Sequence, residues 1–455
     1  MALSTISDYR CMKIKDHPIS KTLATWWRLV FPVHDESFRR FLWIASIAAF
    51  VRVLVMPFFG HIDFFSECRR IYYAYETGSL YPGSRFVTNF IEVMNFRIFA
   101  PFLAEKSSMF GMWDYSMTTA SHLEYFGFLD HRAVLRVFLL LKLPYLIFDL
   151  GIGLLIYHFF TDKKSSLRGA WVWFFNPVSF FAFYIFSRYE SIPLFFVMLT
   201  LLMFRQDRIL WGFVALGLAM WSREIIVILV PFFLIYILRN RQFNWIRIIG
   251  GVAILGVFAG FASNVIPGIL GFKSPFLGSV GSIAEMQESV RILGFQLAWY
   301  FPFVIVYTLL ALGLMVGERA DFRQLITVLG LFYCGFFVLV MHSVHYVSWA
   351  IVLFALIAAE DKQFLKGFVW FCLGWIAFWM VGTDLGVFTQ WLASPGSLFF
   401  VNIPIFPQAL EQFVLKHSAF NLNLVVPAFR SVYAATLVLC AILILRRKDK
   451  AIISE

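Results

Sequence analysis

Ionisable residues inside long apolar stretches are the first feature of this sequence that bears on chemistry. An arginine, lysine or aspartate at the centre of a membrane helix costs at least about 2.5–3.5 kcal/mol, so such residues need partners or a watery cavity. The residues in or at the ends of apolar stretches are Arg52, Lys142, Asp149, Arg188, Glu190, Arg223, Glu224, His342 and His345. Their positions indicate where a functional site would lie.

Two carboxylates follow the first apolar stretch directly. Residues 61–67 (HIDFFSE) begin a run with helical spacing, so Asp63 and Glu67 share one helix face. One interpretation is that Asp63 acts as a general base at the membrane surface. The other is that Asp63 caps the N-terminus of a surface helix, a position that aspartate favours. The local sequence leaves both open.

Arginine–glutamate pairs lie at the joints between apolar segments, Arg188 with Glu190 and Arg223 with Glu224. A mutual salt bridge at the membrane interface would explain each pair. The planar guanidinium fork equally suits the oxygens of a phosphate. Both uses remain open from the sequence.

His342 and His345, three residues apart and followed by Tyr346, resemble half of a metal site. No further His or Cys lies close enough in sequence to complete a zinc set, so hydrogen bonding to an anionic headgroup is the better use. Lys142 and Asp149, two turns apart on one expected helix, favour a structural pair within the membrane.

The composition identifies the elements that must position these residues. Apolar residues make up 60% of the 455 residues and charged residues 14%, with a mean hydropathy of +0.78. Soluble domains are less apolar and about 25% charged, disordered chains are polar, and transmembrane barrels show short alternating segments. The sequence therefore predicts an all-α, polytopic transmembrane protein.

About twelve membrane segments are expected, several of them short or broken at polar joints. They cover residues 41–59, 138–160, 170–186, 190–204, 209–221, 223–238, 246–266, 292–316, 323–341, 344–359, 365–381 and 429–445. Full spans need about 20 residues, and broken helices are tolerated where the backbone lines a polar cavity. Six of these segments and the loop that holds Asp63 bring their polar residues to one membrane face.

The net charge of +11 is explained by orientation, because lysine and arginine gather in cytoplasmic loops. With a cytoplasmic N-terminus, 23 of the 38 such residues fall in short inside segments. These segments are 1–40, 161–169, 205–208, 239–247, 317–323, 360–366 and 446–455. The sequence thus predicts cytoplasmic termini and no nucleic-acid partner.

A basic segment (1–40) and a basic tail (446–455) flank one predicted transmembrane domain, residues 41–445. Its exterior stretches are 60–137, 267–291 and 382–428. Within the first of them, residues 87–104 have apolar residues at helical spacing with polar residues between, which predicts an amphipathic helix on the membrane surface.

The chain resembles the GT-C superfamily of multipass glycosyltransferases, and within it the mannosyltransferases of GPI anchors and of phosphatidylinositol mannosides. The likeness spans residues 41–359. The matching motifs are Gly60–Pro82 (GHIDFFSECRRIYYAYETGSLYP), Lys142–Asp149 (KLPYLIFD) with Asn176-Pro177, Arg188–Pro193 (RYESIP), Arg223-Glu224 with Pro231, and His342–Trp349 (HSVHYVSW).

The resemblance implies an inverting enzyme that transfers a sugar, with mannose favoured, from a polyprenyl-phosphate donor to a lipid-linked or glycan acceptor on the exterior or lumenal face. Asp63 would be the catalytic base. Substrate-binding residues would be His61, Glu67, Arg188, Glu190, Arg223, Glu224, His342, His345 and Tyr346. Many relatives carry two acidic residues where this chain has His61-x-Asp63, which argues against a divalent metal. We therefore expect no cofactor.

The expected membrane is the plasma (inner) membrane or the ER, whose lipids surround the protein. The sequence leaves open whether an accessory subunit binds. A secondary transporter or a lipid or polysaccharide flippase is the alternative function, because broken helices with intramembrane charges fit it also. An acyltransferase using His342 has less support. The one-sided polar residues and the lack of two similar halves favour the glycosyltransferase.

Overall fold

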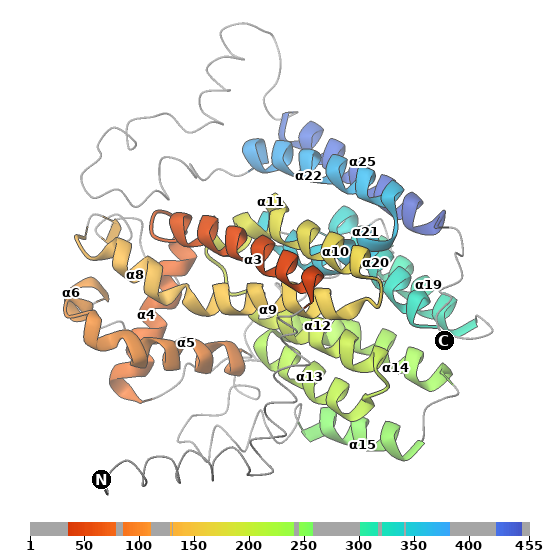
Figure 1. The fold of residues 1–455 in the computed structure, drawn as a ribbon, viewed down its shortest axis with the longest axis horizontal. Helices are drawn as coiled ribbons and strands as arrows, with labels where there is room; N and C mark the ends of the chain where they lie inside the picture. The colour runs from red at the N-terminus through yellow and green to blue at the C-terminus, as the bar shows by residue number, and fades with distance from the viewer. Residues whose placement is uncertain are drawn as a thin grey trace, which may run out of the picture.

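The computed structural model describes residues 35–78, 85–110, 128–129, 131–240, 245–257, 301–316, 321–340, 343–382 and 425–447. Every regular element within these ranges is a helix (Figure 1). The all-helical class is thereby confirmed for this part of the chain. The second exterior stretch, the basic segment up to residue 34, and the tail after residue 447 lie outside it.

Three helices pack together near the start of the fold: α3 (Glu36–Val55), α9 (Leu143–Phe159) and α10 (Lys163–Phe175). Aspartate caps the first and the last of them. The carboxylate of Asp35 accepts from the backbone of α3, and that of Asp162 from the backbone of α10. Such caps satisfy backbone N–H groups that a helix start leaves without partners.

A second group of helices runs along one side of α9. It comprises α12 (Ser191–Arg205), α13 (Ile209–Ser222), the 3₁₀ turn η3 (Glu224–Leu229), α14 (Val230–Arg239) and α15 (Trp245–Gly256). The reversal between α12 and α13 uses Asp207 at φ +56°, a left-handed conformation that aspartate tolerates better than most residues.

The remaining long helices are α19 (Pro302–Val316), α20 (Phe322–Leu339), the 3₁₀ turn η5 (Val344–Val347), α21 (Ser348–Glu360), α22 (Lys362–Gly382) and α25 (Val425–Leu445). Every residue of α21 from Ser348 to Ala359 is buried. This helix therefore lies inside the bundle, where it contacts α10, α20 and α22.

Short helices gather at one end of the bundle, on the left of Figure 1. They are α4 (Ile62–Thr77), α5 (Phe86–Phe99), the 3₁₀ turn η1 (Ala100–Phe102), α6 (Lys106–Phe110) and α8 (Val134–Leu141). Their apolar side chains form a second core, separate from that of the long helices, in which Phe64, Phe96 and Phe138 are almost fully buried. This second core holds the segment that carries Asp63.

The predicted amphipathic helix at residues 87–104 is present as α5 and η1, and two of its polar residues face inward. Thr88 and Glu92 are buried, whereas Phe90 and Ile98 are 46% and 63% exposed. An apolar face directed outward suits contact with lipid. The inward polar face brings Glu92 into the protein.

Among the residues that the structure describes, four helices are long and apolar enough to cross a membrane: Val134–Phe159, Phe322–Leu339, Lys362–Met380 and Pro427–Leu445. Six further apolar helices are shorter. Many large apolar side chains on the bundle are exposed, among them Trp43 and Ile246 at 72% and 76%, which suits a lipid environment. A helical membrane protein is therefore supported, and the number of twelve segments stays a prediction.

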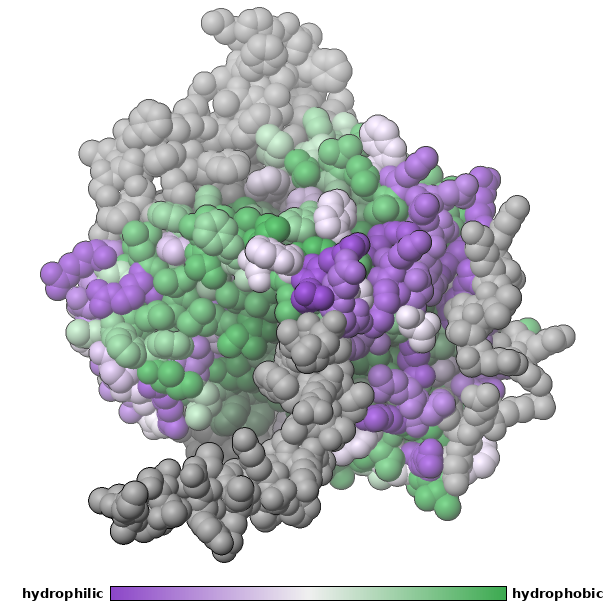
Figure 2. Space-filling view, in the orientation of Figure 1, coloured by the Kyte–Doolittle hydropathy of each residue, from purple (hydrophilic) through white to green (hydrophobic). Residues whose placement is uncertain are grey.

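Hydrophilic side chains are separated from this apolar surface (Figure 2). In that view the largest hydrophilic group lies toward the right, where α3 begins and α9 ends, and a smaller one lies at the left edge. Hydrophobic residues cover the left centre over α3 and α8. The right-hand end includes the predicted inside segment 161–169.

Candidate functional site

The start of α4 positions Asp63, and His61 caps this helix. The backbone N–H of Asp63 donates to Nδ1 of His61 at 3.1 Å. Asp63 therefore lies in the first turn, where the helix dipole favours a negative charge, and its carboxylate makes no cap hydrogen bond. The interpretation that Asp63 caps the helix is wrong, because His61, two residues earlier, supplies the capping atom.

The carboxylate of Asp63 meets two basic side chains. Its Oδ2 lies 3.4 Å from Nη1 of Arg188 and 3.4 Å from Nδ1 of His61, and the side chain is 42% exposed. Burial raises the pKa of Asp63, but the hydrogen bond with His61 and the charges of Arg188, His61 and Arg70 outweigh it and lower that pKa to about 2. The group is thus an ionised carboxylate that a substrate can still reach.

Arg188 is positioned by an interrupted helix. After α10, Asn176 caps the short helix α11 (Pro177–Phe180), which continues as the π-helical turn η2 (Phe181–Ile185). Ser187 then adopts φ +65°, and the N–H of Arg188 donates back to the carbonyl of Ala182 at 2.9 Å. π turns and left-handed residues are concentrated at functional sites.

Lys142 ties this interrupted helix to the segment before Asp63. Its ammonium, fully buried, donates to the carbonyls of Met56 at 2.8 Å, of Phe59, and of Tyr184 at 3.3 Å. The hydroxyl of Ser187 also donates to the carbonyl of Phe59. These bonds hold the chain before Asp63 against the chain before Arg188, so Lys142 positions the site without entering it.

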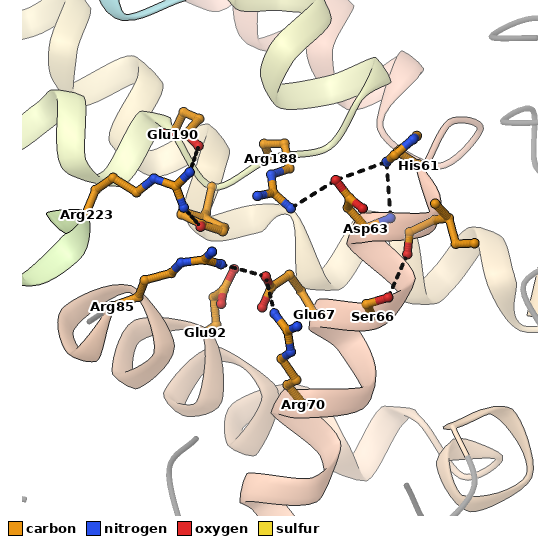
Figure 3. Close-up of polar contacts among 12 residues, drawn as sticks. His61, Asp63, Ser66, Glu67, Arg70, Arg85, Glu92, Arg188, Glu190 and Arg223 are labelled. Atoms are coloured by element: carbon orange, nitrogen blue, oxygen red, sulfur yellow. Dashed lines mark hydrogen bonds and ion pairs between the residues drawn. The ribbon is translucent and has the colours of Figure 1, made fainter. Parts of the chain in front are cut away.

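Three arginines surround the ring of Tyr189, and we call these four residues the Tyr189 cluster. The guanidinium carbons of Arg85 and Arg188 each lie 5.1 Å from the ring centroid, and that of Arg223 lies 5.5 Å from it. They come from the start of α5, the joint after η2, and the end of α13, and they point toward one another in Figure 3. Clusters of this kind recognise phosphate and other anions.

Arg223 also has the most described partners of the three. It donates to the hydroxyl of Tyr189, and to the hydroxyl of Tyr346 at 2.9 Å, and it lies 3.9 Å from Glu190. Glu190 is fully buried and accepts from the indole N–H of Trp349 at 2.8 Å. The predicted pair of Arg188 with Glu190 does not form, because Arg188 pairs with Asp63 and Arg223 reaches Glu190. The predicted pair of Arg223 with Glu224 stays a prediction.

Two glutamates on facing helices complete the polar centre, and their pKa values are shifted in opposite directions. Glu67 of α4 accepts from Arg70 at 2.9 Å and from Arg85 at 3.0 Å. Burial raises the pKa of Glu67, but the charges of Arg70 and Arg85 prevail and lower it. Glu92 of α5 accepts from the hydroxyl of Tyr145 at 2.7 Å, and burial with the nearby charge of Glu67 raises the pKa of Glu92 to about 8.

Two histidines sandwich the ring of Phe186. The ring centroids of His61 and His345 lie 4.1 Å and 4.2 Å from that ring. His345 also stacks on Tyr346 at 4.1 Å, and its Nδ1 lies 2.9 Å from the hydroxyl of Ser343. This stack connects the Asp63 side of the site to the Arg223 side.

The structure brings together eight of the predicted site residues. They are His61, Asp63, Glu67, Arg188, Glu190, Arg223, His345 and Tyr346. His342 and the side chain of Glu224 lie outside the described residues. Sequence reasoning missed Arg85, Tyr189 and Glu92. RYESIP contained Tyr189, but nothing in the local pattern marked Arg85.

The predicted pairing of Lys142 with Asp149 is wrong. Asp149 accepts from Nε of Arg52 at 2.5 Å and from the hydroxyl of Tyr184 at 2.6 Å, and the indole of Trp173 donates to it at 2.8 Å. Seven residues along a helix correspond to about 10 Å, and Lys142 turns to the loop carbonyls instead. All four side chains of this Asp149 cluster are buried.

Within the described ranges, no group of three or more His, Cys, Asp or Glu side chains could hold a metal ion. The chain matches no protein-family model, no curated protein and no solved structure. The arrangement of the site therefore carries the functional argument.

Proposed function

We propose that this protein is an integral-membrane glycosyltransferase. It transfers a sugar, with mannose favoured, from a polyprenyl-phosphate donor to a lipid-linked or glycan acceptor, with inversion at the anomeric carbon. The observation that supports this most is an ionised, accessible Asp63 carboxylate in contact with Arg188, one of the three arginines of the Tyr189 cluster. The proposed transfer requires a proton acceptor for the attacking hydroxyl and cationic groups for the phosphate that leaves.

In the proposed reaction the acceptor hydroxyl attacks the anomeric carbon while Asp63 takes its proton. The bond from that carbon to the phosphate oxygen breaks on the opposite face, and the polyprenyl phosphate leaves with the electron pair. Arg85, Arg188 and Arg223 would stabilise the negative charge that develops on the phosphate. Interactions aimed at this charge lower the barrier more than they tighten ground-state binding.

A carboxylate with a pKa of about 2 is a weak base, and the donor itself would correct this. Arg188 contributes to the lowered pKa of Asp63. A bound phosphate would share the charge of Arg188, raise the pKa of Asp63 and bring it closer to the range in which general bases act well. In this proposal donor binding activates the base, which links the two halves of the site.

The proposed topology places both termini in the cytoplasm and the site on the exterior or lumenal face of the plasma membrane or the ER. Cysteines at Thr77 and Lys164, both exposed, test it. A membrane-impermeant thiol reagent should label the first and not the second in intact cells or sealed vesicles. Burial raises the pKa of the Cys68 thiol, so the native residue stays unreactive. Labelling of position 164 alone would reverse the topology.

The decisive experiment offers the purified full-length protein a polyprenyl-phosphate sugar with candidate lipid and glycan acceptors. Release of polyprenyl phosphate together with a glycosylated acceptor supports the proposal. Absence of release with every acceptor, combined with movement of the lipid across reconstituted vesicles, would contradict it.

One observation favours a proton-coupled transporter or flippase as the second candidate. Glu92 is a buried carboxyl with a pKa of about 8, and it lies at the polar centre of the molecule. Buried carboxyls that gain and lose protons drive many transporters. Flux that depends on a pH gradient and is lost in Glu92→Gln would select this function.

A further inference from the structure

A cavity of about 330 Å³ lies at the end of the helix bundle opposite to the Tyr189 cluster. Its walls are the end of α9, the end of α12, the start of α20 and the ends of α21 and α25. The Tyr189 cluster lies instead beyond the starts of α12 and α21. The cavity and the site already described are therefore separate places on the same helices.

Three arginines and one glutamate line this cavity: Arg205, Arg323, Arg447 and Glu360. Arg447, whose side chain is 7% exposed, forms an ion pair with Glu360. Even so, burial and the charge of Arg323 lower the pKa of Arg447 to about 10. Three guanidinium groups and one carboxylate line the cavity, so its described walls carry a positive charge overall and favour an anion.

Arg205 is held by aromatic rings on one wall of the cavity. Its guanidinium carbon lies 4.5 Å from the ring centroid of Phe159 and 5.7 Å from that of Phe160. Within the described part of the chain Arg205 has no acidic partner, so its charge is not offset there. Cation–π contact fixes the plane of the guanidinium and leaves its N–H groups available to a ligand.

Apart from Thr161, the rest of the lining is apolar. Phe159, Phe160, Ile326 and Leu356 are buried residues that face this space beside the arginines. A ligand that suits such a lining has a compact anionic group with an apolar remainder. Basic pockets between membrane helices bind the headgroups of anionic lipids in this way.

We propose that this cavity binds a phosphate group through Arg205, Arg323 and Arg447, at the end of the bundle remote from the Tyr189 cluster. A membrane lipid or a soluble phosphate can supply the same group. The proposal does not depend on the glycosyltransferase function. It adds a second anion site, for which the bundle itself supplies the walls.

The test uses the purified full-length protein in an uncharged detergent. Binding is measured for dihexanoyl phosphatidic acid, for dihexanoyl phosphatidylcholine as the zwitterionic control, and for inorganic phosphate at constant ionic strength. The variants are Arg205→Gln, the charge-retaining Arg205→Lys, and Glu360→Gln. Arg247→Gln is the matched control, since Arg247 is an exposed arginine that does not line the cavity.

We expect phosphatidic acid to bind and phosphatidylcholine not to bind. Arg205→Gln should weaken Kd about tenfold, the loss of one charge-assisted contact. Arg205→Lys keeps the charge but not the planar fork and should weaken Kd less than Arg205→Gln does, and Arg247→Gln should change it by less than about threefold. Glu360→Gln should tighten binding, because it removes the one described acidic group of the cavity. This second variant keeps the test valid if Arg205→Gln fails to fold.

The two sources of phosphate separate in the same data. Binding of phosphatidic acid alone assigns the site to a lipid headgroup, and binding of inorganic phosphate with the same dependence on Arg205 assigns it to a soluble phosphate. Equal Kd values for the parent and Arg205→Gln, or an equal loss in Arg247→Gln, would show only general surface attraction and overturn the proposal.

Discussion

The Asp149 cluster and the Tyr189 cluster contain similar residues and have different arrangements. In the Asp149 cluster one carboxylate meets one guanidinium, and a tyrosine and a tryptophan donate to its oxygens. Around Tyr189 three guanidinium groups share one ring, and the nearby Asp63 is 42% exposed. A buried charge with all its partners is a structural group, whereas three guanidinium groups around one ring, beside an accessible carboxylate, can exchange contacts with a ligand.

Exposure separates the two carboxylates: Asp149 is fully buried, whereas Asp63 is 42% exposed beside the buried side chains of Arg188 and Tyr189. Arg52 and Asp149 are 1% and 0% exposed, so no substrate reaches them. The positions in the sequence look alike, because both sets lie in or beside apolar segments. The comparison therefore predicts that mutations in one cluster change activity and mutations in the other change stability.

The largest effect is expected from Asp63→Asn. This change keeps size and removes the proposed proton acceptor, and loss of a general base costs about 10²–10⁴ in rate. Since His61 and not Asp63 caps α4, the start of the helix is kept, and loss of the half-exposed ion pair with Arg188 should lower the melting temperature only slightly. Initial rates of sugar transfer and tryptophan-detected melting measure the two quantities. Retention of more than a tenth of the parental rate would assign the base to another residue.

Disrupting the Asp149 cluster should instead reduce stability. Asp149→Leu leaves the guanidinium of Arg52 buried without its carboxylate, a loss of about 3–5 kcal/mol for buried pairs. The double variant Arg52→Met/Asp149→Leu removes both charges and should recover part of that loss. Denaturant midpoints in detergent provide the measurement. A single variant as stable as the double one would mean that the pair contributes nothing.

Much of the fold is visible in the sequence because the membrane imposes simple rules. Unbroken apolar segments and capping aspartates predict helices, and α9 and α12 begin and end close to the expected limits. The partner of Asp149 was not predictable in this way. Arg52 lies 97 residues away in sequence, and only packing of α3 against α9 brings the two together.

The site shows the same division between features that the local sequence reveals and contacts between residues far apart in the chain. Arg188, Arg223 and Asp63 stand out because ionisable residues beside apolar segments are costly. Arg85 lies in an exterior stretch rich in charge, where one more arginine attracts no notice. Its position beside Tyr189 follows from the second core, which fixes α5 against the start of α12 and the end of α13.

A smaller effect is expected from Arg85→Gln, which tests the proposal that the three arginines bind one anion. Losing one charge-assisted contact should raise KM for the lipid donor about tenfold and leave KM for the acceptor nearly unchanged. Arg97→Gln, an exposed arginine on the same helix, is the matched control. Equal changes in both variants would show that Arg85 acts only through the general charge of the surface.

The smallest effects, on the order of 1 kcal/mol in stability after local relaxation, are expected from Glu92→Gln and Glu67→Gln. The two changes in stability have opposite signs. The pKa of folded Glu92 is about 8 against 4.5 for an ordinary Glu. Between pH 4.5 and about pH 8, Glu92 loses its proton in the unfolded chain and keeps it in the folded protein. The stability of the fold therefore falls as pH rises through this range. Glu92→Gln cannot ionise, and its melting temperature should exceed that of the parent at pH 8 and approach it near pH 4.5.

Glu67 supplies the matched control, because Arg70 and Arg85 hold its pKa below the ordinary value. Its carboxylate stabilises the fold above the unfolded pKa, and that contribution is lost as pH falls through the folded pKa. Glu67→Gln should therefore melt below the parent at neutral pH, with a difference that shrinks in acid. Melting curves of both variants across this pH range distinguish the two carboxyls. If both variants shifted in the same direction at pH 8, Glu92 would be an ionised partner of the arginines, and the contrast between the two facing helices would be wrong.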